Sequence, residues 1–494
     1  MNRRYVIITA ISIFVLLLAI PIYSTFFKTN DPIVEEMRAM GVDTTYYFDL
    51  DVDPESKIVT GTASIYALND TEKDLESIYF HLYPNAFEEV EKNDENWETI
   101  LGDFPLPGFI EMKEIKIDGE TSNYVVKNTI LEVPLEWKTN ELTKVELAFT
   151  LNVPLNNNAI SYDQYAMWLG NSLPIKSVYD ESGWNTDPYY PIGDPFYNEM
   201  ANYHVKVKVP KEYQVTNTGL DVSPKIEEDS NIYDITANKV RSFSFAILGN
   251  EYDKVESQIG NKTIRTWYRK SIDSMEAVNR FHEVSEKSIA FFSEKYGEYP
   301  YEDYDVIATR GFFGGMELPG VSLIQGTYFT DNTDYGVNSV AHEAAHQWWF
   351  HVVGSNQIEE PWLDESLTVY STIRFLKEYY PEVAKDTVSR NLHRVTAIDE
   401  LKTEEQLVKS AVTSFKTWDT YFSVIYSIGP LMFDRLENEI GEEKMDSILS
   451  NYFEKYKYKI ATGEDLIQTF VEELGEEAET FFHSWLQNEI TNLH

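Results

Sequence analysis

The chain has 494 residues, which is enough for two or three domains. Of these residues 43% are hydrophobic and 14% aromatic, so the chain can form large cores and is not disordered overall. Its 82 acidic and 41 basic residues give a formal net charge of −41, which disfavours nucleic acid and anionic membrane surfaces as partners. The chain has no cysteine, so disulfides, thiolate metal ligands and lipidated cysteines are excluded.

Residues 1–28 are predicted to form an N-terminal membrane anchor. Arg3 and Arg4 precede an uncharged, mostly apolar run of 23 residues, 5–27, close to the ~20 residues that span a bilayer. A cleaved signal peptide is the alternative, but no Ala-x-Ala-like site is present and Pro21 falls where cleavage is expected. Since the positive charge precedes the run, we expect a single-pass cell-membrane protein whose larger part is extracytoplasmic.

A polar tether is expected over residues 29–42, followed by an all-β domain over residues 43–251. Apolar and polar residues alternate in this region, as in 46–52, 59–65 and 204–209, and turn signals separate the runs. This pattern predicts a sandwich-like domain. A carbohydrate-binding or adhesion module is a minor alternative for it.

Residues 252–494 are predicted to form a mostly helical domain that includes a short strand at 304–308. Apolar side chains recur at helical spacing over residues 273–296, and Gly297 would stop that helix. The pattern from Pro381 onward is also helical. The predicted fold class is therefore multidomain α+β, with an N-terminal all-β sandwich-like domain followed by a mostly helical domain.

The most informative stretch reads His-Glu-Ala-Ala-His at residues 342–346. On a helix, His342 and His346 lie on one face about one turn apart, so both imidazoles can reach one zinc ion. Glu343 leaves the helix at a different angle and can reach a metal-bound water without being a ligand. Because zinc lowers the pKa of such a water to about 7, the carboxylate can take its proton during attack on a carbonyl.

A third metal ligand is needed, and Glu365 is the best candidate. Residues 347–364, eighteen in all, separate it from His346, enough to finish one helix, turn and begin another. The second helix is predicted over residues 362–380, because Pro381 would end it. Its first turn would present Glu365, and the fourth position of the zinc site would stay open for water.

Three motifs together resemble the M1 family of zinc aminopeptidases, which are gluzincins. The first is His-Glu-x-x-His at 342–346 with Trp-Leu-Asp-Glu at 362–365. The second is Gly-Gly-Met-Glu-Leu at 314–318, similar to the family's Gly-x-Met-Glu-Asn loop. The third is Tyr-Ser-Ile-Gly at 426–429, where the family has a tyrosine shortly before Lys-Gly. Weaker similarity runs over residues 45–485.

The resemblance implies a thermolysin-like catalytic domain with one Zn²⁺ per chain, held by His342, His346 and Glu365. Glu343 would be the general base and would later deliver the proton to the leaving amine. Tyr426 would donate its hydroxyl to the oxyanion of the tetrahedral intermediate, and such a donor contributes ~2.7–4 kcal/mol.

The Gly-x-Met-Glu loop would bind the substrate. Glu317 would hold the free amine, because an anion next to the metal site rejects a chain that continues N-terminally. The backbone of Gly314 and Gly315, next to Met316, would lie beside the substrate like an edge strand, where side chains would obstruct. Leu318 departs from the family's asparagine, which bears on the shape of the loop.

Two positions have alternatives. In the family, a Gln or Glu from a loop of the β domain often grips the amine about a dozen residues before an Asp-Pro pair, here 194–195. That spacing selects Glu181, with Gln164 as a more distant alternative and a solvated loop acid as an equally good interpretation. Tyr421 is the second candidate for the role of Tyr426.

The sequence thus predicts a membrane-anchored zinc aminopeptidase that removes N-terminal residues from peptides by attack of a zinc-bound water. Many family members carry a further long helical domain, for which residues 444–494 are too few, so we expect an open cleft. A zinc endopeptidase of open cleft and a non-catalytic peptide-binding protein on the same fold are the alternatives. The expected partners are peptides with a free N-terminus and the membrane, through the N-terminal helix, but not nucleic acid.

Overall fold

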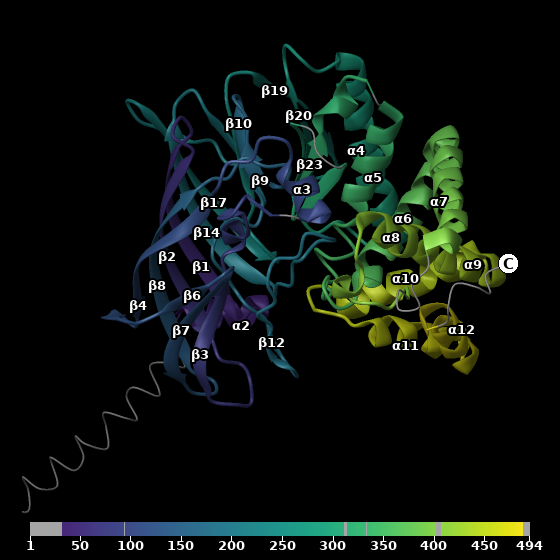
Figure 1. The fold of residues 1–494 in the computed structure, drawn as a ribbon, viewed down its shortest axis with the longest axis horizontal. Helices are drawn as coiled ribbons and strands as arrows, with labels where there is room; N and C mark the ends of the chain where they lie inside the picture. The colour runs from purple at the N-terminus through teal and green to yellow at the C-terminus, as the bar shows by residue number, and fades with distance from the viewer. Residues whose placement is uncertain (1–31, 93, 311–313, 332, 402–406, 488–494) are drawn as a thin grey trace, which may run out of the picture.

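The computed structural model describes residues 32–92, 94–310, 314–331, 333–401 and 407–487 (Figure 1). A β-rich part and a part in which helices surround a smaller sheet lie side by side (Figure 1). This arrangement confirms the predicted fold class. The chain passes from the first part to the second between β18, which ends at Leu248, and β19, which begins at Tyr252. The predicted domain boundaries stay predictions.

An eight-stranded sheet is the largest element of the β-rich part, in the order β16-β17-β14-β1-β2-β8-β4-β5. β1 and β14 pair in parallel, and the other neighbours pair antiparallel. Burial alternates along all eleven residues of β8, so one face of the sheet covers a core. The strands are β1 (Thr44–Asp53), β2 (Ile58–Leu68), β4 (Phe109–Ile117), β5 (Glu120–Thr121), β8 (Leu142–Asn152), β14 (Ala201–Pro210), β16 (Lys225–Ile226) and β17 (Ser230–Val240).

Two four-stranded sheets and a hairpin complete the β-rich part, in the orders β11-β3-β7-β6, β15-β18-β10-β9 and β12-β13. Phe80 of β3, Phe149 of β8 and Leu169 of β10 belong to one hydrophobic core, as expected when sheets pack face to face. The strands are β3 (Leu75–His81), β6 (Val125–Lys127), β7 (Ile130–Trp137), β9 (Ile160–Tyr162), β10 (Ala166–Leu169), β11 (Ile175–Lys176), β12 (Tyr179–Asp180), β13 (Gly183–Trp184), β15 (Gln214–Asn217) and β18 (Phe245–Leu248).

The expected polar tether differs from the structure. Residues 32–40 form the helix α2 (Pro32–Met40), in which Val34 and Met37 are buried. Met37 packs with Val42 and Met200 in a small core of its own. The i, i+3 spacing of the two apolar side chains gives this short helix a face that the β-rich part covers. The other short helices of this part are η1 (Tyr83–Phe87) and α3 (Glu95–Leu101).

The second part begins with a five-stranded sheet in the order β19-β20-β21-β23-β22. β20, β21 and β23 run parallel to one another, whereas the edge strand β22 pairs antiparallel with β23. β22 is therefore the strand at one edge of this sheet. The strands are β19 (Tyr252–Ile259), β20 (Lys262–Arg269), β21 (Asp303–Thr309), β22 (Gly315–Leu318) and β23 (Val321–Gln325).

Helices form the rest of the second part. The predicted helices over 273–296 and 362–380 are confirmed as α4 and α6, and the apolar face expected on α4 is buried. The helices are α4 (Met275–Lys295), η2 (Gly326–Phe329), α5 (Thr333–Ala345), α6 (Pro361–Tyr379), α7 (Pro381–Leu401), η3 (Val412–Ser414), α8 (Trp418–Ser423), the π-helical turn η4 (Val424–Ile428), α9 (Gly429–Ile440), α10 (Glu442–Tyr456), α11 (Gly463–Leu474) and α12 (Glu476–Gln487).

The predicted membrane anchor, residues 1–28, lies outside the described residues. Among the helices that the structure does describe, none is long and apolar enough to cross a bilayer. The two longest, α4 and α7, have 21 residues each, but charged side chains recur along both. This finding contradicts the predicted single-pass membrane localisation and the membrane as a partner, and we withdraw both.

A buried cation connects the two parts. Arg241, directly after β17, donates to the carbonyl oxygens of Phe350 (2.6 Å), Asn198 (2.9 Å) and Lys459 (2.5 Å). A Cβ on Gly354 would lie 2.0 Å from the Arg241 guanidinium carbon, so glycine is required there. Arg241 thereby fixes the loop after α5 against the β-rich part.

Candidate active site

Both histidines of the His-Glu-x-x-His motif are held by α5 and the turn that follows it. His342 lies in the last turn of α5, and His346 is the first residue after its end. The His346 backbone N–H still donates to the His342 carbonyl oxygen (3.3 Å), so the helical spacing is kept. As a result, the two Nε2 atoms lie only 3.1 Å apart.

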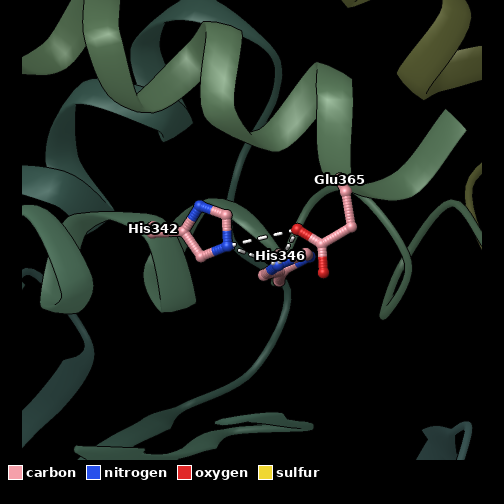
Figure 2. Close-up of side chains that lie close together, drawn as sticks. All are labelled: His342, His346 and Glu365. Carbon is pink, nitrogen blue, oxygen red and sulfur yellow. Dashed lines mark hydrogen bonds and ion pairs between the residues drawn. The ribbon is translucent and has the colours of Figure 1, made fainter. Parts of the chain in front are cut away.

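Glu365 extends from α6 toward the same two imidazoles, as Figure 2 shows. Its Oε2 lies 3.3 Å from His342 Nε2 and 3.5 Å from His346 Nε2. This oxygen is buried and accepts no hydrogen bond. A buried carboxylate oxygen without a donor, facing two imidazole nitrogens, matches the donor set of a zinc site. The three side chains therefore fit a metal ion.

A layer of polar contacts fixes the orientation of His346. Its Nδ1 lies 2.7 Å from Asp364 Oδ1 and 3.2 Å from Thr368 Oγ1. With Nδ1–H donating to Asp364, the lone pair of Nε2 points toward Glu365, the arrangement typical of a metal-binding histidine. Asp364 Oδ2 in turn accepts from Gln357 Nε2 (2.6 Å).

Two of the three ligand candidates, His342 and Glu365, are in protonation states that suit a cation. Burial lowers the pKa of His342, which favours the neutral imidazole. Burial acts to raise the pKa of Glu365, but His346 and His342 beside it hold that pKa below its ordinary value. Burial acts to lower the pKa of His346, but Asp364 and Glu365 beside it hold that pKa well above its ordinary value. A neutral imidazole and an ionised carboxylate are the forms that bind metal.

Glu343 lies beside the metal cluster and against β22. It is buried, and a Cβ on Gly315 would lie 2.2 Å from Glu343 Oε1. Glycine is thus required there because the backbone of the edge strand approaches this carboxylate closely. Burial, with the nearby charge of Glu317, raises the pKa of Glu343 well above its ordinary value.

Tyr426 lies on the π-helical turn η4, and its ring stacks against His342 with centroids 5.8 Å apart. Single π-helical turns are frequent at functional sites, because the extra residue redirects a side chain. Tyr421, the alternative, is buried on α8, and a Cβ on Gly193 would meet its hydroxyl at 2.9 Å. Of the two tyrosines, Tyr426 contributes to the lining of the cavity beside the histidines.

Residues 281–485 match the peptidase family M1 domain. The chain thus contains a peptidase family M1 domain. It is 24% identical over 393 residues to probable aminopeptidase 1 of Sulfurisphaera tokodaii, covering 76% of this chain and 48% of that protein. It is 28% identical over 202 residues to endoplasmic reticulum aminopeptidase 2 of Homo sapiens, covering 38% of this chain and 21% of that protein. The chain thus spans about half the length, or less, of these curated relatives.

The crystal structure of an M1 zinc metallopeptidase from Deinococcus radiodurans has the same fold. Its TM-score to this chain is 0.64 at 15% sequence identity, covering 90% of this chain and 94% of that one. Two-domain M1 peptidases therefore share both parts of the architecture, the β-rich part and the helical part. An M1 domain implies a metal, and the donor set of His342, His346 and Glu365 fits one.

The Gly-x-Met-Glu loop of the M1 domain has two faces. Gly314, Gly315 and Glu317 line the cavity beside the histidines. Met316 and Leu318 are buried in the hydrophobic core of the β-rich part. This alternation follows from the period of two along the strand β22. The departure at Leu318 consequently lies on the core side of the strand.

Glu317 is buried at 5% exposure, and its Oε1 accepts from Gln357 Nε2 (3.1 Å). Burial raises its pKa to about 7. The same amide of Gln357 also donates to Asp364, so Gln357 links the loop to the residues that orient His346. Gln357 was missed by the sequence interpretation, because nothing in its local pattern marks it.

The cavity has a volume of about 230 Å³ and is lined from β22, α5, α6, α7, α8 and η4. Glu181 does not line it. That side chain is exposed at the tip of the β12–β13 hairpin and lines a different cavity of about 860 Å³. Gln164 is also exposed and lines neither.

Asp194 is the acid that the β-rich part does bring to the active-site cavity. Burial, with the charges of Glu317 and Glu365, raises the pKa of Asp194 well above its ordinary value. The sequence held a signal for it, since Asp194 forms the Asp-Pro pair from which the position of Glu181 was counted.

Proposed function

We propose that this protein is a zinc aminopeptidase that hydrolyses N-terminal residues from peptides. The observation that carries the proposal is the convergence of a His-His-Glu metal set with Glu343 and the buried Glu317 in one cavity. The names of its relatives, probable aminopeptidase 1 and endoplasmic reticulum aminopeptidase 2, support this activity. A variant of the Deinococcus radiodurans neighbour is bound to a Tyr-Ser-Ala substrate.

His342, His346 and Glu365 would hold the zinc ion, and Asp364 would keep His346 in the binding tautomer. A bound zinc ion polarises a carbonyl and lowers the pKa of a water molecule to about 7.

Glu343 accepts the proton of the attacking water and returns it to the leaving amine. Its carboxylate is within reach of His346, because their ligand atoms belong to one group spanning at most 4.8 Å. The Tyr426 hydroxyl donates to the oxygen that becomes negatively charged in the transition state. The stacking of the Tyr426 ring on His342, a candidate metal ligand, supports this role.

Glu317 binds the free amine of the substrate and so restricts cleavage to the first residue. The open edge of β22 offers backbone donors and acceptors to an extended peptide, and Gly314 and Gly315 leave room for it. We assign the second amine-binding acid to Asp194 rather than to Glu181, because only Asp194 lines this cavity. The expected open cleft remains a prediction.

The test compares one peptide in two forms, with a free and with an acetylated N-terminus. The aminopeptidase proposal requires cleavage of the free form alone, and Glu343→Gln should lower kcat by ~10²–10⁴ while retaining zinc. Zinc is measured by elemental analysis of both proteins. Cleavage of both forms would instead identify an endopeptidase. A zinc-loaded protein that binds but never cleaves varied peptides would be a binding protein.

A further inference from the structure

Two arginines, Arg390 and Arg394, lie one turn apart on α7 and line the active-site cavity together with His342 and Glu317. Among the described residues, no carboxylate oxygen lies within the 4.0 Å ion-pair distance of either guanidinium. This is notable in a chain with 82 acidic residues. Arg374, by contrast, pairs with three acids.

Aromatic rings hold both guanidinium groups in place. Arg390 lies 4.6 Å from the ring centroid of Tyr335, and its Nη2 donates to Thr387 Oγ1 (3.0 Å). Arg394 lies 5.3 Å from the ring centroid of Phe422. A guanidinium stacked on a ring keeps most of its in-plane N–H donors free, and these match the geometry of a carboxylate.

Charge and burial change together along the cavity. The acidic side chains Glu317, Glu343 and Glu365 are buried, whereas Arg390 is half-buried and Arg394 is exposed. The deep end is therefore negative and the mouth is positive. A peptide whose amine lies at Glu317 extends from the deep end toward the arginines. This polarity is complementary to a short zwitterionic peptide.

We propose that Arg390 and Arg394 form a carboxylate-binding subsite for the part of the substrate that follows the cleaved bond. The inference rests on the proposed aminopeptidase function and specifies its substrate class as short peptides with a carboxylate near the mouth. That carboxylate comes from a free C-terminus or from an Asp or Glu side chain. Partial desolvation and the like charge of Arg390 lower the pKa of Arg394, and a bound anion would offset this repulsion.

The experiment measures kcat/KM for one tripeptide as the free acid and as the C-terminal amide. Two further amides, with Glu or Gln as the third residue, distinguish the two sources of the carboxylate. The wild type should prefer a carboxylate-bearing peptide by ~10- to 100-fold, as charged hydrogen bonds predict, mainly through KM. In the double variant Arg390→Gln/Arg394→Gln this preference should fall toward one.

Arg435→Gln is the matched control, because Arg435 is exposed on α9, with a side chain 69% exposed, and does not line the cavity. Calorimetric binding of the same peptides to Glu343→Gln provides a second measurement that needs no turnover. An equal preference in the wild type and the double variant overturns the inference and leaves the aminopeptidase function standing. Absence of any cleavage overturns the proposed function, and the inference with it.

Discussion

Two buried clusters of charge show how differently the two parts of the molecule use ionisable side chains. In the β-rich part, Lys176 Nζ lies 2.8 Å from Asp43 Oδ2 and 2.6 Å from Glu199 Oε2. In the M1 domain, Glu365 Oε2 faces two imidazole nitrogens without a hydrogen-bond donor. The first cluster is complete within the chain, whereas the donor set of the second fits a cation. A self-paired cluster maintains the fold, and one with an unsatisfied buried acceptor is suited to binding.

The largest expected effect concerns the cluster suited to binding. Tyr426→Phe removes the proposed oxyanion donor and should lower kcat by ~10²–10³ with little change in KM. Steady-state kinetics on a free peptide measure it. Tyr421→Phe is the matched control, because Tyr421 does not line the cavity. Its kcat should fall by less than roughly tenfold. A larger loss in Tyr421→Phe would exchange the two roles.

Removing the cation of the buried cluster in the β-rich part should affect the stability of the fold and not the activity. Lys176→Met leaves Asp43 and Glu199 without their cation and should lower the free energy of unfolding by ~3 kcal/mol. The low end of the usual range is expected because the Glu199 side chain is 31% exposed. Lys206→Met is the control, since Lys206 and Asp49 are 46% and 58% exposed, and it should cost ~0–1 kcal/mol. Equal losses in urea unfolding would contradict the comparison.

A smaller effect, on zinc affinity, is expected from the residue that orients His346. Asp364→Asn keeps the shape of the side chain but weakens the acceptor for His346 Nδ1–H, so zinc affinity should fall ~10- to 100-fold. Competition with a chelator measures the affinity. Asp386→Asn, at an exposed position of α7, should leave it unchanged. Unchanged affinity in Asp364→Asn would mean that Thr368 alone orients the ring.

The smallest expected effect concerns a buried histidine of the β-rich part and the pH dependence of stability. His81, buried in β3 and stacked on Tyr83, has its pKa lowered by burial to about 4. Since the unfolded chain protonates near 6.5 and the folded one only near 4, stability should fall as the pH drops through that window. From pH 7.5 to 5.5 the loss is about 1 kcal/mol. His81→Phe should remove this part of the pH dependence, and an unchanged difference in unfolding free energy would contradict it.

Local spacing predicted several features of the fold well. The alternation along β8 and the helical periods of α4 and α6 follow from backbone geometry. The type and extent of these three elements could therefore be predicted from the sequence. The tether was predicted less well, because the burial of Val34 and Met37 depends on the surface that α2 packs against.

The second amine-binding acid shows where spacing along the chain fails. Counting back from Asp194 led to Glu181, but Glu181 lies at the tip of the hairpin β12–β13 and does not line the active-site cavity. The direction of a loop depends on the elements it packs against, and a residue count contains no such information.

The sequence by itself determined the family, the two histidines one helical turn apart and the glutamate one helix later. The placement of the two histidines is set by the 3.6-residue helical period, which depends on neighbouring residues alone. Only the tertiary structure decided that Asp194, Gln357 and Arg394 belong to the same site. These residues come from three separate segments of the chain. The packing of the β-rich part, the loop before α6 and the helix α7 places their side chains together.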